Sequence, residues 1–428
     1  MDTTSQGQPH AVAPEATAPK SPWKVRDFRT LFTATALSEL GTCVSQVAVP
    51  LAAVLLLEAS PGQVGLLGTL STLAFLLIGL PAGVWVDRMR HRNVLIGADF
   101  ARALLFASIP AAWALDVLTL EQLYAVVALN GCATVFFDVG SQSMLPQVVG
   151  KEALLASNAA IVGLQAAGSV AGRGAGGVLV ALITAPLAIV GTAVLYLASA
   201  LRLLAVRHAP ARQRSGAAPR LRTQMSEGLA HVLRHRELRA LALSATLTNL
   251  GAQPINVLLP VLITRELDLS AAYLGAFWAL GGVGVLLGSR LARPVAARLG
   301  YGRTLGLAGL CTAPAALLVP LLDRGPWFAL AGAGWLLVTL KMGIDNVLGV
   351  SLRQRLTPAP LLGRMNATFR FMLTGAIAVG AMLGGLLGEF ASLRVALWTG
   401  AGILVLAFLP LFLSPVRTRR TLSEQGAE

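Results

Sequence analysis

Long apolar stretches, separated by short polar segments, make up most of the chain. An α-helix needs about 20 apolar residues to cross the roughly 30 Å hydrocarbon core of a bilayer. Twelve stretches are long enough, at about residues 31–57, 63–86, 93–115, 121–143, 157–182, 185–206, 239–263, 272–292, 303–322, 326–350, 365–388 and 393–415. Lipid offers no partner to an open strand edge, and the stretches are too uniformly apolar for barrel strands. The pattern predicts an all-α integral membrane protein with twelve transmembrane helices.

Lysine and arginine are distributed unevenly among the polar segments. With an internal first segment, the inside segments hold 27 of the 34 basic residues, and the outside loops hold three, Arg265, Arg324 and Arg394. Basic residues favour the cytoplasmic side of a membrane. We therefore expect a multi-pass protein of the cell (cytoplasmic) membrane with both termini in the cytoplasm. This topology accounts for the net charge of +14, so we expect no nucleic-acid partner.

The longest polar segment divides the stretches into two groups of six. We expect a disordered cytoplasmic tail at 1–24, an N-terminal six-helix half at 25–206, a cytoplasmic linker at 207–238, a C-terminal six-helix half at 239–415 and a second cytoplasmic tail at 416–428. In the linker, Met225, Leu229, Val232 and Leu233 share one helical face. This spacing predicts an amphipathic helix on the inner membrane surface.

The two halves contain an internal repeat. With a constant offset of 208 residues, Asn158-Ala159, Gly172 and Gly176-Gly177 recur as Asn366-Ala367, Gly380 and Gly384-Gly385. Coincidence in a glycine-rich and alanine-rich sequence is the alternative, but the offset holds over about 40 residues. Two six-helix, pseudo-symmetric halves are a transporter architecture.

Composition narrows the class of function. Only 13% of the residues are charged, whereas soluble domains carry about 25%. The three cysteines lie far apart in apolar stretches, and we interpret them as packing residues. The sequence has no phosphate-binding Gly-x-x-x-x-Gly-Lys-Ser/Thr loop, no Gly-x-Ser-x-Gly elbow and no metal-spaced His/Cys set. We expect no enzyme activity, no metal and no cofactor. The expected partners are the lipid bilayer and a small-molecule substrate, and we expect a monomer.

A glycine, an aspartate and several arginines end the second stretch. Gly83 allows a neighbouring helix to approach, and Asp87 can accept hydrogen bonds from a helix N-terminus in the other half. Arg88 and Arg92 can pair with carboxylates or with the membrane surface. We interpret the four residues as a conformational latch, with a merely topogenic loop as the alternative. The pattern resembles the loop 2–3 signature of the major facilitator superfamily.

Closely spaced glycines occupy the fifth stretch, at Gly168, Gly172, Gly176 and Gly177. Small residues at this spacing let two helices pack closely. The segment resembles the antiporter motif of drug exporters in the superfamily, but Arg173 stands where that motif has proline. A charge at this depth needs a partner or water. Generic close packing is the alternative to an antiporter role.

The wider pattern resembles the macrolide-efflux and enterobactin-exporter branch, the third family of drug:proton antiporters in the superfamily. This resemblance covers nearly all of residues 25–415 and is carried by segments such as PLAAVLLLEASPGQVGLLGTL and LLGRMNATFRFMLTGAIAVGAMLGGLLG. It implies the major facilitator fold and export of an antibiotic, drug or siderophore, with the proton gradient as the energy source. Val127 stands where the proton-linked motif has an arginine, so coupling through that position is not expected.

Charged residues within the stretches are candidates for proton transport or ion pairing, because a lone charge there costs at least about 2.5 kcal/mol. They are Glu39, Asp99, Arg102, Asp138, Arg173, Lys341, Asp345 and Arg370. We hypothesise that Glu39 or Asp138 carries the transported proton. The pairs Asp99–Arg102 and Lys341–Asp345 each share a helix face. We interpret both pairs as ion pairs that fix packing, with a functional role as the alternative.

A substrate cavity is expected between the halves, lined by the first, fourth, seventh and tenth helices among others. The candidate cavity residues are Gln46, Asn130, Phe136, Phe137, Asn249, Gln253 and Asn256. Few fixed charges suit a lipophilic cargo, although these residues could also serve as interhelical hydrogen-bonding groups. We predict a secondary active transporter that exports a small, lipophilic molecule from the cytoplasm by proton-coupled alternating access. The alternative is an importer, a uniporter or a lipid flippase of the same fold.

Overall fold

Helices make up nearly all of the chain that the computed structural model describes, which is residues 21–168, 172–206 and 221–419. Some side chains within these ranges, those of Asp87 and Arg173 among them, lie outside the description. The α-helices are α1 (Arg26–Leu56), α2 (Pro61–Asp87), α3 (His91–Ala114), α4 (Leu120–Ala167), α5 (Arg173–Ile183), α6 (Ala185–Leu203), α7 (Leu221–Arg234), α8 (Arg236–Val261), α9 (Ala271–Leu299), α10 (Tyr301–Thr312), α11 (Pro326–Arg355), α12 (Leu362–Phe390), α13 (Leu393–Leu406) and α14 (Leu409–Phe412). Short 3-10 or π segments are η1 (Pro22–Lys24), η3 (Leu262–Glu266), η4 (Ala313–Leu321), η5 (Ala359–Leu361) and η6 (Pro415–Thr418).

The described helices account for the predicted membrane spans. Eleven of them are long and apolar enough to cross a membrane, and the shorter segment Gly174–Ile183 is also apolar. The prediction of an all-α, multi-pass membrane fold is confirmed. The connection between the fourth and fifth predicted spans differs from a loop, because α4 continues from the fourth into the first part of the fifth and only Gly150, at a φ of 70°, interrupts its helical backbone. Glycine adopts this conformation without a steric penalty, so the connection is a kink.

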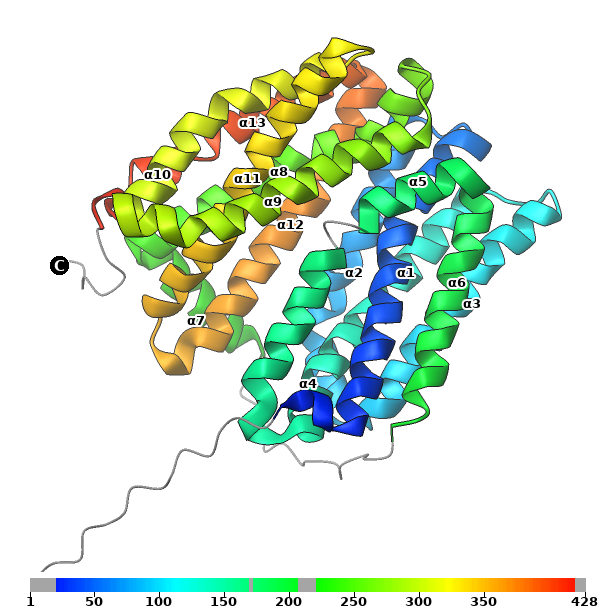
Figure 1. The fold of residues 1–428 in the computed structure, drawn as a ribbon, viewed down its shortest axis with the longest axis horizontal. Coiled ribbons are helices and arrows are strands. Elements are labelled where there is room, and N and C mark those ends of the chain that lie inside the picture. Colours follow the sequence, from blue (N-terminus) through cyan, green and yellow to red (C-terminus); the bar gives the residue numbers. More distant parts are fainter. Residues whose placement is uncertain (1–20, 169–171, 207–220, 420–428) are drawn as a thin grey trace, which may run out of the picture.

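The helices form two bundles, which Figure 1 shows side by side. One contains α1–α6, coloured blue to green, and the other contains α8–α14, coloured yellow-green to red. Between the bundles, α2 packs on α12 and α5 packs on α9. The linker helix α7 packs on α12, where Glu227 pairs with Arg364, and it buries Val232. Leu229 and Leu233 remain exposed, and the side chain of Met225 lies outside the described residues.

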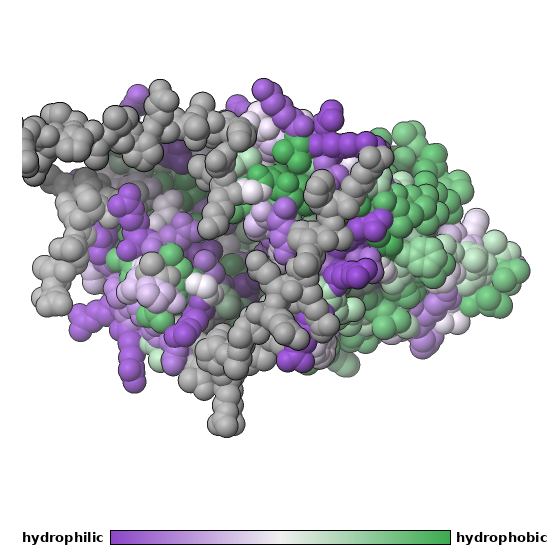
Figure 2. All heavy atoms as spheres, turned by 90° about the horizontal axis from the view of Figure 1, so that it is seen from below, coloured by the Kyte–Doolittle hydropathy of each residue, from purple (hydrophilic) through white to green (hydrophobic). Residues whose placement is uncertain are grey.

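The two ends of the bundles differ in charge. One end carries the basic segments 88–92, 290–303 and 353–364, and we call it the arginine-rich end. The opposite end carries the turns at residues 57–60, 115–119, 267–270 and 322–325. Figure 2 views the arginine-rich end, where hydrophilic residues gather over the helix ends while hydrophobic residues cover the flank on the right. This separation of charge along the helix axes is the one the sequence predicts.

Both expected tails contribute ordered residues to the bundles. Residues 1–20 and 420–428 lie outside the described chain, but η1 falls within the predicted first tail. Its Trp23 ring lies 5.3 Å from Phe28 and 4.9 Å from Phe32, and these edge-on contacts hold η1 against α1. At the other end of the chain, the carbonyl of Arg419 accepts from Gly302 N at 2.9 Å. The tail boundaries at residues 24 and 416 therefore lie inside structured segments.

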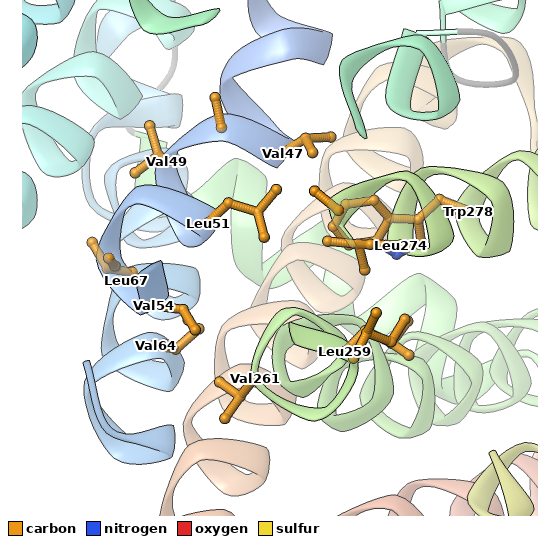
Figure 3. Close-up of a cluster of buried hydrophobic side chains, with 14 of the residues drawn as sticks. Val47, Val49, Leu51, Val54, Val64, Leu67, Leu259, Val261, Leu274 and Trp278 are labelled. Atoms are coloured by element: carbon orange, nitrogen blue, oxygen red, sulfur yellow. The ribbon is translucent and has the colours of Figure 1, made fainter. Parts of the chain in front are cut away.

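The largest apolar cluster joins the two bundles toward the opposite end. Its buried members include Leu51 of α1, Leu67 of α2, Leu259 of α8 and Leu274 of α9. Figure 3 shows valine and leucine side chains of α1 and α2 facing those of α8 and α9. Between membrane helices, such contacts stabilise through close packing. Close packing of apolar side chains thus holds the halves together at this end.

Candidate functional site

Two pairs of glycines bring the backbones of the halves into contact at the opposite end. A methyl group placed on Gly177 of α5 would lie 2.5 Å from the Cα of Gly275 in α9. The same group on Gly65 of α2 would lie 2.5 Å from the Cα of Gly385 in α12. Real side chains do not approach a backbone this closely, so both contacts require glycine. Gly177 and Gly385 are equivalent positions of the 208-residue repeat, and the fold uses them in the same way.

The other glycines of the antiporter-like segment face the first helix of their own half. A Cβ on Gly172 would lie 2.5 Å from Cys43 Cβ, and one on Gly176 would lie 3.2 Å from a methyl of Val47. Gly168 packs near the side chain of Glu39. In the second half, Gly384, the repeat partner of Gly176, packs in the same way on the backbone of α8. This region therefore has close packing on two faces, while the side chain of Arg173 lies outside the described residues.

Two polar contacts also cross between the halves at the opposite end. Arg265 in η3 donates to the carbonyl oxygens of Ala59 at 3.0 Å and Val54 at 3.4 Å, near the end of α1. A carboxylate oxygen of Glu389 in α12 accepts from Gly62 N at 2.9 Å, in the first turn of α2. Helix ends leave backbone groups without helical partners, and their dipoles favour a cation at the C-terminus and an anion at the N-terminus. Each charge therefore matches the helix end of the other half.

A cavity of about 430 Å³ lies between the halves on the inner side of these contacts, and we call it the central cavity. Four of the predicted residues line it, namely Gln46, Asn130, Gln253 and Asn256. The apolar part of its wall includes Phe75, Phe106, Trp278 and Ile377. Trp278 donates its indole N–H to Asn256 Oδ1 at 3.2 Å, which fixes the orientation of that amide. Amides beside aromatic rings make a wall that suits an amphipathic ligand.

A second cavity of about 750 Å³, the vestibule, adjoins the central cavity toward the arginine-rich end. Thr42, Gln46, Thr134 and Asp138 line both spaces, so the two are contiguous. Glu39, Phe137 and Arg102 line the vestibule, as do residues of the second part of α4. Together the two cavities run from the centre of the molecule toward one end, while the opposite end is sealed.

An ion pair joins the two halves where these spaces meet. Asp138 of α4 and Arg370 of α12 approach to 3.5 Å between carboxylate and guanidinium, and both side chains are partly exposed to the cavity. The guanidinium of Arg370 also lies 4.1 Å from the ring centroid of Phe75 in α2. Such a cation–π contact stabilises the guanidinium. The sequence identified both charged residues as candidates but gave no reason to pair them across the halves.

Arg102 organises the interior of the first half. Its side chain is 1% exposed, and each of its five N–H groups has an acceptor, from Ser38, Thr42, Asp99, Asn130 and Tyr196. The distance to Asp99 is 3.0 Å, and the guanidinium lies 4.0 Å from the centroid of the Tyr196 ring. These acceptors come from α1, α3, α4 and α6. The predicted Asp99–Arg102 pair is thus the centre of a network that ties four helices together.

The other predicted pair lies in the second half and away from the cavities. Lys341 pairs with Asp345 one turn along α11. Lys341 is buried and lines a small hollow with Thr248 and Phe408. The position of Lys341 beside α10 and the turn between α13 and α14 places this pair in the packing of its own half.

Among the latch residues whose side chains are described, Gly83, Arg88 and Arg92, none has a contact between the halves. The expectation that a helix packs on Gly83 is wrong here, because a Cβ at Gly83 would meet nothing within 4 Å. Arg92 donates to the carbonyls of Leu203 at 3.3 Å and Leu204 at 2.6 Å, at the end of α6 in its own half. Arg88 is exposed, and the side chain of Asp87 lies outside the described residues.

Two predicted cavity residues point elsewhere. Phe136 lies in a stacked arrangement with Trp85 of α2, at 6.2 Å between ring centroids, and is not among the residues around either cavity. Phe136 and Phe137 are adjacent in sequence and therefore lie about 100° apart around α4, so the two rings cannot share one direction. Asn249 lies one turn before Gln253 and donates to the carbonyl of Ala245 at 2.9 Å in its own helix. Asn249 is not among the residues around either cavity.

Several side chains of these contacts were not identified from the sequence. Ser38 and Thr42 share one face of α1 with i,i+4 spacing, and Tyr196 is the one tyrosine of the sixth stretch. These signals could have indicated a polar network around Arg102. Arg265 and Glu389 lie just beyond or at the ends of predicted spans, where charge is expected in any membrane protein. The sequence therefore does not predict that these two residues contact the other half.

Comparison with known proteins places this arrangement in a family. Residues 17–426 match the family model described as transmembrane secretion effector. The chain is 28% identical to the enterobactin exporter EntS of Salmonella paratyphi A, covering 90% of this chain and 91% of the relative, and 28% identical to EntS of Escherichia coli O1:K1, covering 92% of each.

Solved transporter structures share its fold. A mutant of the nucleoside transporter NupG superposes with a TM-score of 0.74 at 14% identity, covering 90% of this chain and all of that one. A bacterial homologue of the iron transporter ferroportin superposes with a TM-score of 0.71 at 20% identity, covering 91% and 98%. The chain is therefore a transporter and belongs to the transmembrane secretion effector family of the major facilitator superfamily.

Proposed function

We propose that this protein exports a small amphipathic molecule across the cell membrane in exchange for protons, and that Asp138 is the proton-binding group. The observation that carries the proposal is the Asp138–Arg370 ion pair, because it joins the two halves inside the cavity. The similarity to enterobactin exporters supports the outward direction. The charge asymmetry of the sequence supports a cytoplasmic location for the arginine-rich end and for both termini.

The exchange follows from what a proton does to this pair. In the conformation described, the cavities extend toward the arginine-rich end, so cargo enters from the cytoplasm while Asp138 is ionised and held by Arg370. Once the halves rock and the cavity faces outside, a proton on Asp138 removes the negative charge and frees Arg370. The cavity then prefers the proton to the cargo, which is the negative coupling that an antiporter requires. Glu39, which lines the vestibule, is the second candidate for the proton.

The cavity wall limits the cargo. Paired amides from Gln46, Asn130, Gln253 and Asn256 offer donors and acceptors, and Phe75, Phe106 and Trp278 offer apolar contact. Two of the charged side chains nearby are paired with opposite charges, since Arg370 pairs with Asp138 and Arg102 pairs with Asp99. Such a cavity suits a molecule with hydrogen-bonding groups on an aromatic or aliphatic frame. A siderophore and a lipophilic antibiotic both meet this description.

Export from an efflux-deficient bacterium tests the proposal. Susceptibility and accumulation are measured against a panel of antibiotics, dyes and catechol compounds, with and without a protonophore. We expect lower accumulation of at least one compound, lost when the protonophore is added. A uniporter would equalise concentrations regardless of the protonophore, and an importer would raise accumulation.

Everted vesicles test the proton site. Asp138→Asn should abolish cargo-induced proton release while leaving downhill exchange of cargo, and Asp116→Asn is the matched control. Asp116 lies in the turn after α3 at a φ of 56°, a conformation that asparagine tolerates. Glu39→Gln tests the second candidate for the proton-binding group in the same proton-release measurement. Wild-type proton release by the Asp138 variant, with loss in the Glu39 variant, would transfer the role to Glu39.

A further inference from the structure

A hollow of about 550 Å³ lies on the outer side of the second half at the arginine-rich end. The beginning of α8 forms one wall, with Arg236, Arg239 and Leu243. The end of the described chain forms the other, with Leu413 and Arg417. Residues from widely separated parts of the sequence therefore meet at one place, and none of them lines the central cavity or the vestibule.

Both walls change from apolar to basic in the same direction. Arg236, Arg239 and Leu243 follow an i, i+3, i+7 spacing and lie on one face of α8. Leu413 directly follows α14, and Arg417 lies four residues later in η6. Leu243 is 41% exposed and Leu413 is 75% exposed. In each wall the leucine lies nearer the apolar span and the arginine nearer the polar end.

The arginines lack a visible counter-charge. All three are exposed, and none of the described residues that line the hollow is acidic. The neighbouring carboxylate of Glu237 is buried and bonded to Arg419 at 2.8 Å. Guanidinium groups bind phosphate oxygens through paired N–H donors. Three of them around one hollow favour an anion with phosphate chemistry.

We propose that this hollow binds an anionic phospholipid, with its phosphate headgroup between Arg236, Arg239 and Arg417 and an acyl chain along Leu243 and Leu413. A soluble anion would use the arginines but would leave the exposed leucines uncovered. A lipid satisfies both, and basic pockets at the cytoplasmic face of membrane helices recognise such headgroups. The lipid would fix the beginning of α8, whose later residues Gln253 and Asn256 line the central cavity.

Native mass spectrometry of the purified full-length protein tests this site directly. The protein in detergent is titrated with phosphatidylglycerol, with phosphatidylcholine and with inorganic phosphate. We expect one phosphatidylglycerol retained well beyond the other two probes. The variant R236Q/R239Q/R417Q should lose about a hundredfold in affinity, because each basic residue contributes roughly a factor of five toward an anionic lipid.

The control removes the same charge from the same end of the molecule. Arg290, Arg293 and Arg298 on α9 are exposed and lie outside this hollow, so R290Q/R293Q/R298Q should retain phosphatidylglycerol within about twofold of the wild type. If the triple variant of the hollow misfolds, Arg417→Gln alone should weaken binding about fivefold. Equal losses in the two triple variants, or phosphate binding as tight as lipid binding, would overturn the proposal. The measurement needs no transport assay and is independent of the cargo.

Discussion

The two ends of the molecule hold the halves together by different means. At the opposite end, Gly177 touches Gly275, Gly65 touches Gly385, and an apolar cluster surrounds both contacts. Toward the arginine-rich end, the Asp138–Arg370 ion pair crosses the cavity. Shape complementarity does not depend on protonation, whereas an ion pair does. Protonation of Asp138 would therefore weaken the contact toward the arginine-rich end and leave the glycine contacts at the opposite end unchanged.

If the two ends act separately, each half must move as a rigid unit. Substitution of Arg102 should disturb the rigidity of the first half most strongly. Arg102→Gln removes the centre of the network and leaves Asp99 buried without its cation. Breaking a buried pair costs about 3–5 kcal/mol. We expect a clear loss of thermal stability of the purified protein, measured by unfolding in detergent. Arg90→Gln, at an exposed position of the same half, is the control and should unfold like the wild type.

A side chain at the glycine contact should break the sealed end. Gly177→Val places methyl groups against the backbone of Gly275, which cannot move aside as a side chain could. Overpacking of this kind costs about 1–3 kcal/mol, which here falls on the sealed conformation. Spin labels on α2 and α12 at this end should report a longer distance, and efflux should fall steeply. Gly163→Val has open space around it and serves as the control. Unchanged distances in the Gly177 variant would falsify the shape argument.

The polar contacts at the sealed end should contribute less. Arg265→Gln and Glu389→Gln each remove one charge from a helix end of the other half, in a setting open to solvent. We expect each substitution to destabilise the sealed conformation by about 0.5–1 kcal/mol. Both together should raise the population of molecules that are open at this end several-fold. Arg394→Gln is the matched control, because Arg394 pairs with Glu266 at 3.3 Å and Asp323 at 3.6 Å within its own half. An equal effect of the control variant would show that net charge, not the crossing contact, matters.

The smallest expected effect is a pH dependence at the arginine-rich end. His235 Nδ1 accepts from Leu238 N at 3.4 Å and caps α8, and burial lowers the pKa of His235 despite the nearby Glu237. His231 and Arg419 also face it and lower the pKa further. The folded protein therefore binds this proton less readily than the unfolded chain does, so stability falls as the pH drops below about 6.5. Loss of the cap costs about 1 kcal/mol or less.

Replacing the histidine isolates this contribution. His235→Asn keeps a capping oxygen but does not titrate, so its stability should vary less with pH between about 5 and 7. His91→Asn, in the other half, should leave the wild-type pH dependence in place. Identical pH profiles for the wild type and the His235 variant would assign the effect to another group.

The fold was largely predictable because length and apolarity alone define membrane spans. The repeat of Gly172 and Gly176 at Gly380 and Gly384 also indicated close helix packing in both halves, but only the structure identifies the partner as the first helix of each half. The kink at Gly150 was not predictable in this way, because a glycine in a polar segment is equally compatible with a loop. Hydrophobic pattern gives the number of spans but not the path between them.

The candidate site was less predictable, for a reason specific to membranes. In a soluble helix the polar face marks the outside, but here both the lipid-facing and the core-facing positions are apolar. Phe136 and Phe137 therefore looked alike in sequence, although Phe136 lies beside Trp85 and Phe137 lines the vestibule. Asp138 and Arg370 are far apart in the chain, so neither periodicity nor spacing could pair them.

The glycine pairs also have a mechanical consequence. Where two surfaces meet without side chains, nothing interlocks, so no rotamer has to change before they slide. Gly177 against Gly275 and Gly65 against Gly385 are two such contacts without side chains, and each includes one copy of the repeated glycine. Two contacts of this kind would permit one half to tilt against the other, while their close packing would resist separation of the halves. The sealed end would then resist sliding only weakly, and the Asp138–Arg370 ion pair on the other side would contribute more of the resistance to movement between the halves.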